Sequence, residues 1–398
     1  MKLAERVQHI SPSQTQELIG KAKEMKKAGI EVIEFQAGEP DFNTPENIKE
    51  AGIAAINENF TRYTAAPGTI ELREAICEKL KKENNLDYSP EQIVVSNGGK
   101  HSLYNVFMVL VDPGDEVIVP APYWVSYPEM VKLAGGKPVV VQADSSTDFK
   151  ITPEQFEEAI TDKTKILILN SPSNPTGAVY TKDELQAIAE VAVKHNIYVI
   201  SDEIYEKLVY DELEFVSTAS LGEDIKKLTI TINGVSKAYA MTGWRIGYAA
   251  AEKEIAKAMA KVQGQATSGP SSISQKASLE AISGNQEEVE KMRKEFDKRR
   301  KFIVEKLNSI PGVSCSMPKG AFYAFPDISQ LFGKTIAGVE VNDSKTFADL
   351  LLEKCHVVAV HGSAFGSEGN LRFSYATSME NIEEGLNRME KLIKGEIK

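Results

Sequence analysis

Lys237 and Arg245 are the residues whose types and surroundings most clearly suggest chemistry. The chain ahead of them, Leu228 to Ile232, is apolar and β-branched, which suits a buried strand, and Asn233 and Gly234 are expected to break this strand. Most lysines lie on solvated surfaces, so a loop lysine without a chemical role is the simpler alternative. A partly buried lysine close to a fixed cation instead favours the neutral amine, which is a nucleophile able to form a Schiff base. Lys237 is therefore a candidate catalytic amine.

A strand, a glycine pair and a helix form a candidate anion site. The predicted strand Gln92 to Ser96 leads through Gly98 and Gly99 to a predicted helix over Ser102 to Leu110. Glycines let the backbone approach an anion, and the first N–H groups of a helix face it. The GxxxxGK[ST] spacing of a nucleotide-binding Walker loop is absent. The neighbouring Lys100 is either a further cation of this site or a solvated loop lysine.

Trp124, Asn174 and Asp202 each follow a predicted strand. Each has a simpler interpretation: Trp124 packs in the core, prolines beside Asn174 end the strand, and Asp202 caps the next helix. Strands and helices alternate here, which predicts an open parallel sheet, and ligands bind outside the carboxyl ends of such strands. One shared site is therefore expected. The strands concerned are Glu116 to Val119, Lys165 to Leu169 and Tyr198 to Ile200.

Arg372 lies in a short apolar segment, Asn370 to Ala376, of the C-terminal part. A buried arginine needs an anion, and its planar fork suits a carboxylate, although a structural ion pair is the alternative. Around it the pattern changes to short strands mixed with helices, which predicts a smaller α+β domain. The predicted strands are Glu31 to Phe35, Ala321 to Phe325 and Val357 to Val360. A polar helix is expected from Ser11 and Pro12 through Lys27, and a charged, solvated helix over Gln286 to Ser309. The chain after Gly247 is also expected to be helical.

Composition bounds the class of protein. At 398 residues, of which 42% are hydrophobic, the chain is long enough for a large core and two domains. A formal net charge of −11 argues against nucleic acid or an anionic membrane as the main partner. The three cysteines are widely scattered, so neither a disulfide framework nor a metal site is expected. No apolar run suits a signal peptide or a membrane span, so we expect a soluble, cytoplasmic protein.

The segment Val235 to Tyr248, VSKAYAMTGWRIGY, resembles the cofactor-lysine signature of class I aminotransferases, the fold-type I pyridoxal-phosphate (PLP) enzymes. The strings GEPDF and NPTG also match, and the resemblance covers about Ser11 to Ile393. It is closest to bacterial aspartate aminotransferases of the lysine-using subgroup. It implies an α/β fold: a large domain, residues 46–285, with a mostly parallel seven-stranded sheet flanked by helices, and a smaller α+β domain from residues 1–45 and 286–398.

The resemblance also implies how the cofactor is held. Lys237 carries PLP as a Schiff base and moves the substrate's α-proton. Asp202 keeps the pyridine nitrogen protonated, while Asn174 and Tyr205, one helical turn beyond Asp202, contact the 3-oxygen. The remaining cofactor contacts are implied for Gly98, Gly99, Lys100, Trp124, Ser236, Arg245 and, from the neighbouring subunit, Tyr63. The last contact implies an obligatory homodimer with shared active sites.

For the substrate, the resemblance assigns the α-carboxylate to Arg372 and Gly38. It assigns the distal carboxylate of aspartate to Lys100, with Ser13 and Thr15 close by. Trp124 and Asn174 line the same space. The partners implied are therefore small amino acids and 2-oxo acids.

The reaction implied is transfer of the amino group of L-aspartate to 2-oxoglutarate in a ping-pong cycle, giving oxaloacetate and L-glutamate. The alternatives are an aminotransferase that uses prephenate or aromatic amino acids, and a PLP-dependent C–S lyase. Two positions depart from the family: Gly234 replaces a serine that contacts the phosphate in many members, and Ser11 replaces the basic residue of prephenate-using relatives. A PLP-binding transcription regulator is disfavoured, because about ten residues precede Ser11 and the chain is acidic.

Overall fold

The computed structural model describes residues 3–12 and 14–397. Within them, seven strands form one sheet in the order β2-β8-β7-β6-β5-β3-β4. Every neighbouring pair is parallel except the two made by β8, which confirms the mostly parallel sheet. The strands are β2 Ile93–Ser96, β3 Glu116–Ala121, β4 Lys137–Gln142, β5 Thr164–Asn170, β6 Tyr198–Asp202, β7 Thr229–Gly234 and β8 Gly247–Ala250.

The inner strands are buried along nearly their whole length because helices cover both faces of the sheet. The sequences of β3, β5 and β6 are accordingly near-continuous apolar runs, whereas β7 alternates threonine and isoleucine. One core lies under α5, α6 and α10, a second under α7, α8 and α9, and a third under α4 and α11. These helices are α4 Ile70–Asn84, α5 Gly99–Leu110, α6 Ser126–Leu133, α7 Pro153–Glu158, α8 Lys182–His195, α9 Glu223–Leu228, α10 Lys253–Ala266 and α11 Ser272–Ser283, and α3 Glu46–Asn57 packs on α11.

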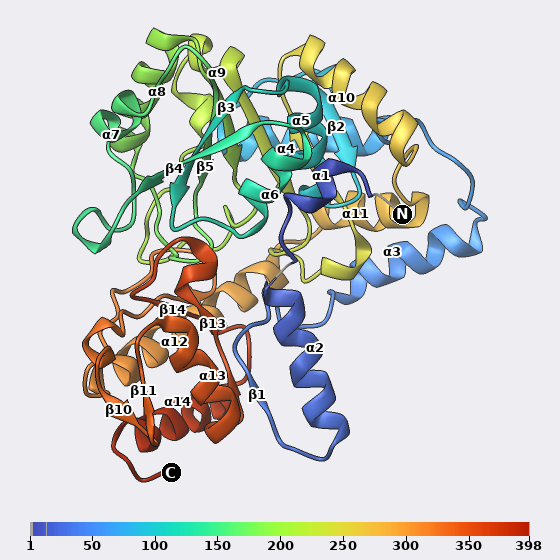
Figure 1. The fold of residues 1–398 in the computed structure, drawn as a ribbon. Coiled ribbons are helices and arrows are strands. Elements are labelled where there is room, and N and C mark those ends of the chain that lie inside the picture. Colours follow the sequence, from blue (N-terminus) through green and yellow to red (C-terminus); the bar gives the residue numbers. More distant parts are fainter. Residues whose placement is uncertain (1–2, 13, 398) are drawn as a thin grey trace.

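The C-terminal elements form a separate core below the sheet in Figure 1, drawn in orange and red, with α2 and β1 of the N-terminal segment beside them. The strand β1 pairs with β12, so both ends of the chain contribute to this part. Its elements are α2 Gln14–Lys27, β1 Ile33–Glu34, α12 Glu287–Ser309, β9 Tyr323–Ala324, β10 Thr335–Ile336, β11 Val339–Glu340, α13 Ser344–Cys355, β12 Val357–Val358, β13 Val360–His361, β14 Leu371–Ser374 and α14 Met379–Ile393.

Several local predictions were wrong. The strand β7 continues through Gly234, because this residue pairs closely with Gly247. Gly247 begins the strand β8 rather than a helix, since small residues let this strand fit between β2 and β7. The helix expected to start at Ser11 and Pro12 starts at Gln14, after the separate short helix α1 Glu5–Gln8.

No helix in the described ranges is long and apolar enough to cross a membrane. Likewise, among residues 3–12 and 14–397, no three His, Cys, Asp or Glu side chains are grouped as a metal ion requires.

Candidate active site

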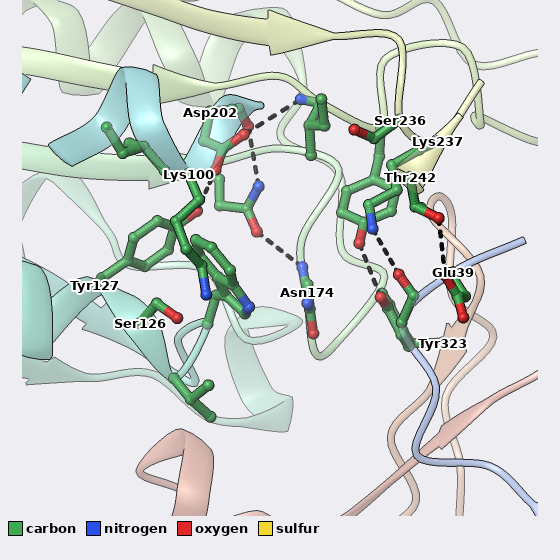
Figure 2. Close-up of a pocket in the computed structure, with 18 of the residues that line it drawn as sticks. Glu39, Lys100, Ser126, Tyr127, Asn174, Asp202, Ser236, Lys237, Thr242 and Tyr323 are labelled. Carbon is green, nitrogen blue, oxygen red and sulfur yellow. Dashed lines mark hydrogen bonds between the residues drawn. The ribbon is translucent and has the colours of Figure 1, made fainter. Parts of the chain in front are cut away.

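A cavity of about 410 Å³ opens where the carboxyl ends of the sheet strands face the C-terminal core (Figure 2). Asp202 ends β6, and the N-terminus of α5 adds Gly99 and Lys100. The C-terminal core supplies Arg372 from β14. The predicted site residues that line the cavity are Gly38, Gly99, Lys100, Trp124, Asn174, Asp202, Tyr205, Ser236, Lys237, Arg245 and Arg372.

The other predicted site residues do not line the cavity or lie outside the described residues. Gly98 adjoins the cavity through its contact with Arg245. Tyr63 is 97% exposed and does not line the cavity. Ser13 lies outside the described residues, as does the side chain of Thr15.

Lys237 lies partly buried in the loop that follows β7. Its Nζ donates to the carbonyl oxygen of Gly38 at 2.5 Å. Burial lowers the pKa of the amine to about 8; Glu39 opposes this effect, while Arg372 and Arg245 add to it. The amine is therefore much closer to neutrality at physiological pH than an exposed lysine, as a nucleophile requires.

Asp202 is a buried carboxylate at the end of β6. It accepts hydrogen bonds from the Tyr127 hydroxyl at 2.7 Å and from the N–H of Ile204 at 3.3 Å. Burial raises the pKa of Asp202 to about 6, and the bond from Tyr127 counteracts part of that rise. The backbone after Asp202 forms turns rather than the expected helix, and this brings Tyr205 into the cavity wall.

Arg372 is fully buried and, among the described residues, has no carboxylate partner. Its Nη1 donates to Oδ1 of Asn174 at 2.9 Å and its Nη2 to the carbonyl oxygen of Gln36 at 2.8 Å. Its Nε has no partner in the described structure. The guanidinium lies over the ring of Tyr323, 4.6 Å from the centroid. A buried cation that keeps a free donor is built to take an anion from outside the chain.

The backbone of Gly98 and the side chain of Arg245 form a second anion-binding corner. Gly98 precedes α5 with φ at 91°, and a Cβ there would collide with the guanidinium of Arg245. That guanidinium donates to the carbonyl oxygens of Thr242 at 2.9 Å and Asn97 at 3.3 Å.

Lys100 supplies a further cation at the cavity. Its Nζ lies 4.7 Å from the centroid of the Trp124 ring. Desolvation is the main cause that lowers the pKa of Lys100, and the positive charge of the nearby Arg245 lowers it further.

Sequence reasoning missed several residues of this cavity. Tyr127 lies in the same proline-flanked segment as Trp124, and Tyr323 lies in a predicted strand. Neither residue belongs to a sequence motif that would assign it a function. Glu39 lies inside the GEPDF string and accepts a hydrogen bond from the Thr242 hydroxyl at 2.8 Å (Figure 2). The contacts of these side chains depend on tertiary packing.

The side chains present fit pyridoxal phosphate. Gly98 and the N-terminus of α5 leave room and N–H donors for a phosphate beside Arg245. Asp202 is a buried acceptor suited to a protonated ring nitrogen, and Lys237 is a partly buried amine with a lowered pKa. The cavity volume is also typical of sites for small cofactors and substrates.

Comparison with known proteins assigns the class. The sequence model of the family described as aminotransferase class I and II matches residues 30–389. The chain belongs to this family and is a PLP-dependent aminotransferase.

Among individual relatives, the chain is 50% identical over 393 residues to an aspartate aminotransferase of Bacillus sp. strain YM-2, covering 98% of this chain and 99% of the relative. It is 51% identical over 395 residues to an aspartate/prephenate aminotransferase of Cereibacter sphaeroides, covering 99% of each. The crystal structure of an aspartate aminotransferase from Rhizobium meliloti superimposes with a TM-score of 0.97, at 44% identity and full coverage of both chains.

Proposed function

We propose that this chain transfers the amino group of L-aspartate to 2-oxoglutarate, giving oxaloacetate and L-glutamate in a ping-pong cycle. The observation that carries the proposal is that two cations reach one cavity from different walls. Arg372 enters from β14 and Lys100 from α5, and neither is neutralised by a carboxylate within the described residues. A dicarboxylic acid offers one anionic group to each, which supports the role that we propose for Lys100 by resemblance to the lysine-using subgroup.

The proposed roles follow from contacts of the side chains. Arg372, whose Nη1 is already held by Asn174, orients the α-carboxylate of the substrate. The backbone of Gly38, whose carbonyl oxygen accepts from Lys237, borders the same part of the cavity. Lys237 accepts the α-proton as a neutral amine and returns it. PLP, when bound, withdraws electrons from the carbon that loses this proton.

The polar residues around the ring position keep that electron withdrawal effective. Asp202 provides the buried negative charge that holds a proton on the ring nitrogen. We assign Asn174 and Tyr205 to contact with the 3-oxygen and Trp124 to stacking on the ring, and all three line the cavity. We assign the phosphate to Gly99, Ser236 and Arg245, which line the cavity, and to Gly98, which adjoins Arg245.

We infer that the working form is a cytoplasmic homodimer with shared active sites. Tyr63 does not reach the cavity of its own chain, although the resemblance gives it a phosphate contact. Apolar side chains near it in sequence are also left in water: Ile53, Ile56 and Ile70 are 46–55% exposed. In the described chain the three cysteines are free, in keeping with a reducing compartment. We also propose the domain division at residues 46–285, which the separate cores support.

Prephenate is a second candidate substrate because the Cereibacter relative carries it in its name. A C–S lyase is the less favoured alternative, since it has no need of Lys100. Separate half-reactions followed by absorbance distinguish these activities. We expect aspartate to convert the protein-bound PLP band to the pyridoxamine form, and 2-oxoglutarate to restore it. Conversion by prephenate-derived or aromatic amino acids alone, or release of pyruvate and ammonia from a β-substituted amino acid, would contradict the aspartate assignment.

A further inference from the structure

Tyr323 is a buried cavity residue to which neither the sequence motifs nor the family resemblance assigned a role. It lies on β9, which pairs with β14, the strand that carries Arg372. Its side chain belongs to the C-terminal core and also lines the cavity, where its hydroxyl lies 2.8 Å from that of Tyr205 (Figure 2). Both phenols are buried, so each hydroxyl depends on the other for a hydrogen bond.

The position of the Tyr323 hydroxyl is tightly fixed. A Cβ on Gly38 would lie only 3.0 Å from it, so the backbone at Gly38 packs directly against the phenol oxygen. The ring of Tyr323 is held edge-on to that of Tyr205, with centroids 5.8 Å apart. The hydroxyl therefore has little freedom to turn away from Tyr205.

The charge of Arg372 makes Tyr323 the better donor of the pair. The guanidinium carbon lies 4.6 Å from the centroid of the Tyr323 ring. A cation over an aromatic face stabilises negative charge on that ring and so strengthens the O–H as an acid. Burial raises the pKa of both phenols, but the bond between them lowers that of Tyr323 and raises that of Tyr205.

We propose that Tyr323 is a positioning residue that donates its hydrogen bond to the Tyr205 oxygen and thereby directs the Tyr205 proton towards the 3-oxygen of the cofactor. This inference rests on the proposed contact of Tyr205 with that oxygen. Donation to the 3-oxygen favours its ionised form and lowers the pKa of the Lys237 linkage to PLP. Tyr323, which lies on the strand next to the one that carries Arg372, thus helps to lower the pKa of the Lys237 linkage to PLP.

The test is a spectroscopic pH titration of the holoenzyme with the substitutions Y323F, Y205F and both together. Without the Tyr323 donor, the Tyr205 hydroxyl can turn away from the cofactor, so we expect the linkage pKa in Y323F to rise by roughly half a pH unit or more. Y205F should raise it further. The double variant should match Y205F alone, because Tyr323 acts through Tyr205.

Two controls separate this role from general damage. Y210F removes another buried phenol, whose hydroxyl donates to the carbonyl oxygen of Ala321 at 2.6 Å, and should leave the linkage pKa unchanged. Y323F keeps the ring beneath Arg372, so its affinity for the dicarboxylate maleate should stay within about twofold of the parent protein.

Each other outcome overturns the inference in a recognisable way. If Y205F raises the linkage pKa and Y323F does not, the role of Tyr323 is wrong and that of Tyr205 stands. If Y205F has no effect, the proposed contact of Tyr205 fails and the inference fails with it. Additive shifts in the double variant, or an equal shift in Y210F, would show that Tyr323 does not act through Tyr205. Should Y323F fail to fold, Y323H, which keeps a ring and a donor, should retain a linkage pKa below that of Y205F; an equal or higher value would refute the donor role.

Discussion

Lys237 combines burial with neighbouring cations, and both effects destabilise its ammonium form. Arg372 and Arg245 act on it from two sides, while Glu39 supplies the opposing charge. The amine of the protein without cofactor therefore loses its proton near pH 8 rather than at its ordinary value. The desolvation that makes the residue reactive also makes the charged form unfavourable to bury.

This balance predicts how the cofactor-free protein takes up PLP as the pH changes. The neutral amine is the reactive form, and its fraction increases with pH. The uptake rate should rise roughly tenfold per pH unit below pH 8 and level off above about pH 8. Stopped-flow absorbance measures it directly. A rate that keeps rising to pH 10 would show that the pKa of the Lys237 amine is not lowered.

Lys100 should decide the preference for acidic substrates. The substitution K100M keeps the apolar stem beside Trp124 but removes the charge, so kcat/KM for aspartate should fall by roughly 10- to 100-fold. The value for an uncharged amino acid should change little. The matched control is K226M, because Lys226 lies over the ring of Tyr88, 5.2 Å from its centroid and outside the cavity. Equal losses for both substrates would remove Lys100 from substrate recognition.

At the level of single residues, the sequence identified side chains that belong to motifs and missed those defined by contact. Lys237 and Asp202 were recognisable from their neighbours in the chain. Tyr127 and Tyr323 were not, since their roles arise from hydrogen bonds to residues 75 and 118 positions away. Such partners become visible only when the strands are in place.

Among the secondary-structure elements, the junction of β2 and α5 shapes the anion-binding corner formed by Gly98 and Arg245. In G98A the new methyl group would meet Arg245, at a residue whose φ is 91°. We expect PLP affinity to fall by roughly tenfold or more, because the guanidinium must move. Gly114 has φ at 99°, and a Cβ added there would meet nothing within 4 Å, so G114A should cost about 1 kcal/mol of stability without weakening PLP binding. Equal PLP affinities in the two variants would refute the steric argument.

The pairing of β7 with β8 restricts the residue at Gly234, the position at which the family resemblance implies a serine. A Cβ at Gly234 would lie 2.8 Å from Cα of Gly247 and 2.9 Å from the carbonyl oxygen of Ile246. G234S should therefore lower the free energy of unfolding by roughly 1–3 kcal/mol and should not tighten PLP binding. G243S, where a Cβ meets nothing within 4 Å, should stay within about 0.5 kcal/mol of the parent. Thermal unfolding and PLP titration measure both effects, and tighter PLP binding by G234S would contradict this explanation.

The elements that the sequence predicted best were long or continuously apolar. Five strands of the large sheet and the helix α5 were predicted within a few residues. Three of these strands, β3, β5 and β6, are near-unbroken apolar runs because both of their faces are buried. The strand β8 was missed, since its Gly-Tyr-Ala-Ala sequence has little β preference and is extended through pairing with both neighbours. The strand β4 was also missed: its apolar run, Val139 to Val141, is short and follows a proline, and the strand lies at the sheet edge with no buried residue.

In the whole molecule, buried arginines of the helix α12 pair with carboxylates from two distant segments of the chain. The sequence predicted a solvated charged face, but Arg300 is fully buried and pairs with Asp211 at 2.6 Å. Arg299 pairs with Asp41, beside the loop that contacts Lys237, at 2.8 Å. These pairs fix α12 against both the sheet region and the N-terminal segment. The charged pattern of this helix thus reflects structural ion pairs as well as solvation.

If the active site is shared between two chains, two inactive variants should restore activity when they form a mixed dimer. K237A removes the amine of its own chain, and Y63A removes a side chain that we assign to the other chain's site. Each variant alone should be strongly impaired. A mixed dimer of the two contains one site with both native residues, so unfolding and refolding an equal mixture should restore about one quarter of the parent activity. The control mixes K237A with D202N: both residues line the cavity of their own chain, so neither site of that mixed dimer is intact and no activity should return. Equal results from the two mixtures would show that Tyr63 does not complete the neighbouring site.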